Sequence, residues 1–149
     1  MRVSFYELPS QSQDSPEALV EHVSELILTH YKQGQYMTLL CETKAQAEAL
    51  DEFIWQQPAE HFIAHNLSGE GPANGTPVDI TWLEAIKTSP IRNKKLVINL
   101  SLSFLAQFAA FQHIIDFVPS VEIEKEAARE RYKQYKQAGC DMVFNRADT

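Results

Sequence analysis

The stretch YMTLLC, residues 36–41, is apolar at nearly every position and has the length of one β-strand. A strand with one face in water alternates apolar and polar residues, so this pattern indicates a strand covered on both faces. Residues 96–100, LVINL, repeat the pattern. Further strands are expected at 3–8, 62–65, Val78–Trp82 and His113–Val118, and residues 140–144 form either an edge strand or a tail.

Helical segments alternate with these strands. Ser15 and Pro16 provide a helix start, and Gly34 provides the matching end. Thr43 and Gln46 form a capping box for a helix that reaches about Trp55, with an inward stripe at Ala47, Leu50 and Ile54. The spacing of Phe104, Phe108 and Phe111 predicts a short helix over 102–111, and a further helix is expected over 121–138.

Alternation of buried strands with helices is typical of an α/β fold with a largely parallel sheet. The chain has 149 residues and shows no linker. We therefore expect a single three-layer α/β/α domain that spans residues 1–149.

The charge balance bears on the choice of partners. Lys and Arg number 13 and Asp and Glu number 20, which gives a net charge of −7. Dedicated nucleic-acid-binding domains depend on neutralising phosphates, so direct binding to DNA or RNA is not expected. No secretory signal and no membrane-spanning apolar run is visible, and a cytoplasmic protein with reduced cysteines is expected.

Motifs that support catalysis are weak. The loop around Gly69 and Gly71 resembles a phosphate-binding turn, but Pro72 follows where a P-loop has lysine. His61 and His65 are spaced by four residues without any pattern typical of a metal site. The sequence therefore predicts no catalytic residues, no metal and no cofactor.

The helix expected over 121–138 segregates its charges. Its cations and one tyrosine fall within an arc of roughly 100° on a helix of 3.6 residues per turn: Lys125, Arg129, Tyr132, Lys133 and Lys136. Its inward stripe is predicted to be Ile123, Ala127 and Ala138. Such a cationic face is either simply solvated or binds an anion, and cations beside a ring suit a carboxylate on an apolar side chain. Val118, just before this helix, provides a possible apolar wall.

Trp55 stands at the end of its helix, where an apolar stripe normally stops, and Phe62 follows the next turn. The pattern leaves two interpretations open. Both rings belong to the core, or both are exposed and anchor a partner protein.

Three stretches resemble the chi subunit family of bacterial DNA polymerase III. They are VSFYEL (3–8), LDEFIWQQPAEHFIAHNLSGEGP (50–72), and DFVP (116–119) leading into ARERYKQYKQAG (128–139). The resemblance implies a non-enzymatic adaptor without cofactors, which links the clamp loader, through the psi subunit, to the C-terminal tail of single-stranded-DNA-binding protein. That acidic tail ends in Pro-Phe.

The resemblance also implies site residues. The tail site falls on Val118, Lys125, Arg129, Tyr132 and Lys133, and the psi-facing aromatics fall on Trp55 and Phe62. Lys136 is supported by helix geometry alone. Two other interpretations stay open: a nucleotide-binding enzyme or enzyme relic that uses the Gly69–Gly71 loop, and a scaffold with the psi contact alone.

Overall fold

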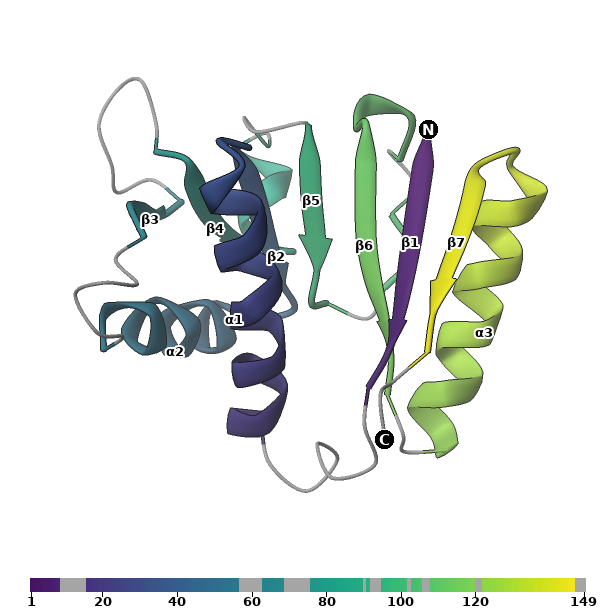
Figure 1. Ribbon diagram of the computed structural model, residues 1–149, viewed down its shortest axis with the longest axis horizontal. Coiled ribbons are helices and arrows are strands. Elements are labelled where there is room, and N and C mark those ends of the chain that lie inside the picture. The colour runs from purple at the N-terminus through teal and green to yellow at the C-terminus, as the bar shows by residue number, and fades with distance from the viewer. Residues whose placement is uncertain are drawn as a thin grey trace.

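The computed structural model describes residues 1–8, 16–56, 63–68, 76–89, 91, 95–101, 103–105, 108–119 and 122–146, with the side chains of 16–22 left out. Its centre is a seven-stranded sheet in the order β3-β4-β2-β5-β6-β1-β7 (Figure 1). The strands are β1 (Arg2–Glu7), β2 (Met37–Cys41), β3 (His65–Leu67), β4 (Val78–Trp82), β5 (Leu96–Asn99), β6 (His113–Val118) and β7 (Asp141–Asn145). Every pairing is parallel, which confirms the expected α/β class.

Three α-helices lie within the described residues: α1 (Pro16–Lys32), α2 (Lys44–Trp55) and α3 (Glu122–Gln137). Two 3-10 turns, η3 (Ala85–Lys87) and η4 (Phe108–Ala110), are shorter. Gly34 and Gly139 follow α1 and α3 with φ of 76° and 90°, a left-handed conformation that favours glycine at helix ends. At α2 the Gln46 backbone amide donates to Thr43 Oγ1 at 3.1 Å, which confirms Thr43 as the N-cap. The other half of the predicted capping box differs, because the Gln46 side chain accepts from the Glu42 amide at 2.8 Å.

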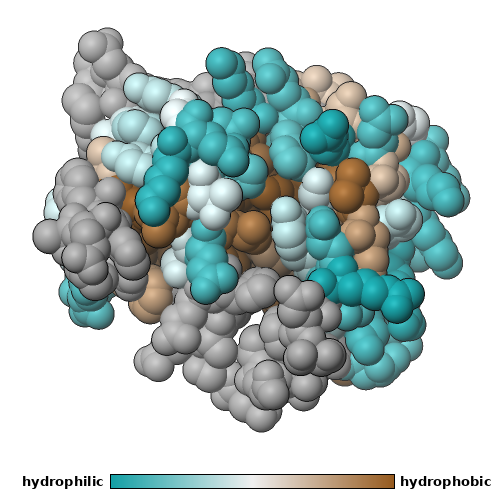
Figure 2. Space-filling model, in the orientation of Figure 1, coloured by the Kyte–Doolittle hydropathy of each residue, from teal (hydrophilic) through white to brown (hydrophobic). Residues whose placement is uncertain are grey.

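The two faces of the sheet bury separate apolar clusters. One cluster joins α1 and α2 to β2, β4, β5 and β6, and it contains the predicted inward residues Ala47, Leu50 and Ile54. The other lies on the opposite face, where α3 covers β1, β6 and β7. The three-layer arrangement is therefore confirmed. On the side of the molecule where α3 lies, the outer surface carries many hydrophilic side chains (Figure 2).

The strand predicted over 62–65 is misplaced, because β3 begins at His65. The sequence left open whether residues 140–144 form an edge strand or a tail. The structure shows the edge strand β7, which pairs with β1. In the described part of the chain, no helix is long and apolar enough to cross a membrane.

The helix predicted over 102–111 is wrong. Among the described residues of that segment, only Phe108–Ala110 is helical, and it forms a 3-10 turn. The Asn99 side-chain amide donates to the Ser103 carbonyl at 2.7 Å, and the Leu105 amide donates to the Tyr135 hydroxyl at 3.0 Å. The Ser103 carbonyl, which in a helix over 102–111 would accept from the backbone, accepts from a side chain here. The Leu105 amide would have no partner inside such a helix, and it is satisfied by a side chain of α3.

Candidate functional site

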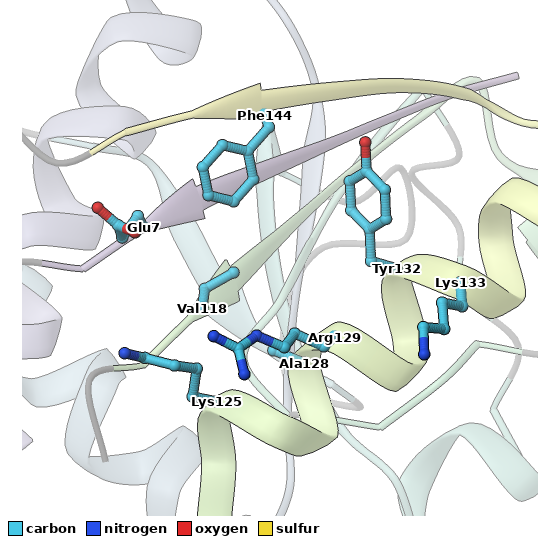
Figure 3. Close-up of a pocket in the computed structure, with 8 residues that line it drawn as sticks. All are labelled: Glu7, Val118, Lys125, Ala128, Arg129, Tyr132, Lys133 and Phe144. Carbon is cyan, nitrogen blue, oxygen red and sulfur yellow. The ribbon is translucent and has the colours of Figure 1, made fainter. Parts of the chain in front are cut away.

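A cavity of about 460 Å³ opens where β1 and β6 end and α3 begins (Figure 3). The carboxyl edge of a parallel sheet is the usual place for a binding site in this fold class. The cavity is lined by Glu7, Val118, Lys125, Ala128, Arg129, Tyr132, Lys133 and Phe144. Three elements besides α3 contribute, since Glu7 ends β1, Val118 ends β6 and Phe144 belongs to β7.

The five residues predicted for the tail site are among these lining residues: Val118, Lys125, Arg129, Tyr132 and Lys133. Lys136, which had only helix geometry in its favour, is exposed and does not line the cavity. Sequence reasoning missed Glu7, Ala128 and Phe144. For Glu7 and Phe144 the signal was topological, because the ends of neighbouring parallel strands meet at one edge of the sheet.

The predicted inward stripe of α3 is wrong. Ile123 is 80% exposed, and Ala127 and Ala138 are exposed as well. The residues that α3 buries are instead Ala128, Arg131 and Tyr135. The prediction assumed that the inner face of this helix would carry small apolar residues. That face instead contains an arginine paired with an aspartate, and a tyrosine.

Arg131 is buried against Asp116 of β6. Its Nε donates to Asp116 Oδ2 at 3.1 Å and its Nη2 donates to Oδ1 at 3.2 Å. Nη2 also donates to the Phe117 carbonyl, and the Phe117 amide donates to Asp116 Oδ1 at 2.7 Å. Burial raises the pKa of the Asp116 carboxyl, while the guanidinium and these hydrogen bonds oppose the shift. The pair fixes α3 on the sheet and so fixes the rotation of the helix that bears the cavity's cations.

Aromatic contacts hold the neighbouring side of α3. The Phe5 ring lies edge-on to Tyr132 at 5.3 Å and to Tyr135 at 6.2 Å between ring centroids. Tyr135 is fully buried, and burial is the main cause that raises its pKa. Tyr132 is only partly buried, so it is anchored by the core and still borders the cavity.

Charge in the cavity is concentrated on α3. Lys125, Arg129 and Lys133 supply three cations along the helix, and Glu7 supplies an acid from the end of β1. Lys125 lies in the first turn of α3, where the helix macrodipole adds positive potential. Val118, Ala128, Tyr132 and Phe144 provide apolar surface beside these cations. The arrangement suits an anionic ligand that also carries an apolar group.

Trp55, at the end of α2, is 58% exposed, so the interpretation that both rings belong to the core is wrong for Trp55. Its ring lies 4.9 Å from that of His65 between centroids. His65 is buried and bridges two neighbours, with Nδ1 donating to the Ile63 carbonyl at 2.7 Å and Nε2 at 3.1 Å from Asp51 Oδ1.

Two sequence-based candidates lie outside the described residues. Phe62, predicted beside Trp55, is one, and the loop that contains Gly69 and Gly71 is the other. The described residues contain no cluster of three or more His, Cys, Asp or Glu side chains that could hold a metal.

The fold and the site define a class of protein: a binding module with two candidate contact surfaces. One surface is the cationic, partly aromatic cavity, and the other is the exposed Trp55. Comparison with known proteins identifies the family. Residues 1–143 match the family described as DNA polymerase III chi subunit, HolC. This chain belongs to that family.

Individual relatives of the chain are chi subunits as well. The chain is 38% identical over 140 residues to DNA polymerase III subunit chi of Escherichia coli, covering 93% of each protein. It is 36% identical over 124 residues to the chi subunit of Haemophilus influenzae, covering 83% of this chain and 84% of the relative. For the chi subunit of Pseudomonas aeruginosa the identity is 28% over 145 residues, covering 97% and 96%.

Among solved structures, the crystal structure of T4 UvsW superposes with a TM-score of 0.67 at 9% identity. The match covers 98% of this chain and 41% of UvsW. At that identity the likeness shows a shared fold alone.

Proposed function

We propose that this protein is an adaptor that links the clamp loader of DNA polymerase III, through the psi subunit, to the C-terminal tail of single-stranded-DNA-binding protein. Membership of the chi family makes it a non-catalytic accessory subunit of the polymerase holoenzyme. The adaptor acts in the cytoplasm. The observation that supports the tail contact is the cavity on α3, where three cations border an apolar, aromatic surface.

The chemistry of the cavity matches the end of such a tail. The terminal carboxylate pairs with Arg129, whose guanidinium can donate two parallel hydrogen bonds to it. The phenyl ring of the last residue packs against Val118 and Tyr132, and acidic residues further along the tail approach Lys125 and Lys133. The lysines and Arg129 are close to solvent, so salt should weaken binding.

Titration with synthetic tail peptides tests this function. A peptide of acidic residues that ends in Pro-Phe should bind with micromolar affinity, as expected for a contact of this size. The same peptide with a C-terminal amide, or without its Phe, should bind at least about tenfold more weakly, because each change removes one of the two matched groups. Equal affinity for all three peptides would contradict the proposal.

The psi contact is proposed for the surface around Trp55. A large exposed ring at the end of a helix is the kind of side chain that dominates protein–protein contacts. The contact between the rings of Trp55 and His65 favours one orientation of the indole in the free protein. A side chain that is already oriented loses less conformational entropy when a partner binds.

Replacing Trp55 with alanine is expected to weaken psi binding by about thirtyfold or more, as for an interface hot spot. Stability should change little, because the ring is 58% exposed. Isothermal titration or co-purification with psi measures the effect. Ile123→Ala is a matched control, since Ile123 is also strongly exposed but lies on α3, which packs on the opposite face of the sheet. If the two variants bind psi equally well, Trp55 is not part of the contact.

A further inference from the structure

Phe144 is an unusual side chain for an edge strand. It is 45% exposed on β7, although Met142, two residues earlier on the same face of the strand, packs into the apolar cluster under α3. Exposing a large ring costs hydrophobic stabilisation that burial would have provided. The position is therefore better explained by what the ring borders than by packing of the core.

The ring of Phe144 borders the cavity across from α3. Figure 3 shows it turned from β7 toward Val118, with Tyr132 and Arg129 reaching the cavity from the helix. Tyr132 is fixed by its edge-on contact with Phe5, so that wall of the cavity is anchored in the core. Phe144 and Tyr132 thus provide aromatic surfaces from two different elements, and Val118 provides an aliphatic one.

We propose that Phe144 determines specificity by forming a second aromatic wall, which makes the cavity prefer an acidic peptide that ends in an aromatic residue over one that ends in an aliphatic residue. This inference rests on the tail-binding function proposed above. Aromatic pairs in edge-to-face or offset arrangements gain stabilisation beyond the area they bury, and an aliphatic side chain gains only the area. The α3 cations then recognise the carboxylate, and Phe144 recognises the ring that carries it.

The test compares two peptides that differ only in their last residue, Phe or Leu, on several protein variants. The measured quantity is the ratio of the two dissociation constants. In Phe144→Ala and in Phe144→Leu, the preference for the Phe peptide should fall by about threefold to tenfold. Phe144→Leu keeps an apolar contact, so its effect reports on the ring. The salt dependence of binding should stay unchanged, because the cations are intact.

Val143→Ala is the matched control. Val143 is the neighbouring residue, is 40% exposed, and points to the other face of β7, and it does not line the cavity. The ratio of the two dissociation constants measured for Val143→Ala should equal that of the wild type. Urea unfolding of each variant shows whether β7 and the rest of the fold are retained.

The possible outcomes separate this inference from the function on which it rests. If the wild type binds the Phe peptide, and Phe144→Ala and Phe144→Leu keep the wild-type preference, the role of Phe144 is overturned while the tail contact stands. If the wild type binds neither peptide, the tail-binding function fails and the inference fails with it. A lowered preference in both Phe144 variants, with Val143→Ala unchanged, supports the inference.

Discussion

Replacing Arg131 with methionine is expected to lower the free energy of unfolding by about 3–5 kcal/mol, the usual cost of breaking a buried ion pair. Arg131 is 3% exposed and Asp116 is fully buried. Methionine fills much of the space of the arginine stem, so the loss is mainly that of the charge partner of Asp116. Chemical denaturation at neutral pH measures the effect.

Two comparisons make this expectation specific. Arg129→Met, two residues away on the exposed side of α3, should change stability by no more than about 0.5 kcal/mol, as for an ordinary surface substitution. Adding Asp116→Asn to Arg131→Met should restore part of the stability, because the amide removes the unpaired charge and still accepts from the Phe117 amide. If the double variant is as unstable as Arg131→Met, the loss comes from packing.

The pH dependence of Arg131→Met provides a further signature. Without the guanidinium, burial raises the pKa of Asp116 in the folded state further above its value in the unfolded state. The folded state then binds more protons than the unfolded state, so stability rises as pH falls. The loss caused by Arg131→Met should therefore be smaller near pH 5 than near pH 7.

Replacing Arg129 with alanine is expected to weaken binding of the Phe-ending acidic peptide by about tenfold to hundredfold, the range for a lost hydrogen bond to a charged group. The reason is that Arg129 supplies the planar donor pair that matches a carboxylate, which the flanking lysines cannot reproduce. The loss should be smaller with the C-terminally amidated peptide, because that peptide lacks the charge. Titration calorimetry at two salt concentrations measures both effects.

Lys136→Ala is the control for this substitution. Lys136 lies on the same exposed side of α3 as Arg129 but outside the cavity, so its removal changes the net charge without touching the ligand. The affinity of Lys136→Ala for the Phe-ending acidic peptide should stay within about threefold of the wild-type affinity. Equal losses in Arg129→Ala and Lys136→Ala would mean that the peptide responds only to the overall charge of the helix.

The sequence was most informative where one physical pattern dominates. Unbroken apolar runs indicated β2 and β5, and the apolar face of α2 was assigned correctly, because burial there is achieved by apolar side chains alone. The cationic arc of α3 was also recovered, since helix periodicity places side chains without knowledge of the tertiary structure. Four of the five predicted tail-site residues share that helix.

The errors arose where polar groups satisfy one another in the interior. Arg131 looks like a surface residue until Asp116 of β6 is brought against it, and that contact depends on how α3 packs on the strand that precedes it. Likewise, Asn99 and Tyr135 bind backbone groups of the segment that was expected to be helical. Glu7 and Phe144 reach the cavity only because β1 lies between β6 and β7 in the sheet. Local periodicity carries none of this information.

The position of β1 also has a consequence for the order of folding. Ser4 and His113, which touch across β1 and β6, are 109 positions apart, and β7 comes later still. During synthesis, β1 therefore leaves the ribosome long before either of its neighbours exists, and it must wait unpaired. Since Glu7, Val118 and Phe144 come from these three strands, the cavity cannot be complete until synthesis has passed residue 144. A nascent or truncated chain without β7 would lack one wall of the cavity, so the proposed tail recognition depends on completion of the sheet.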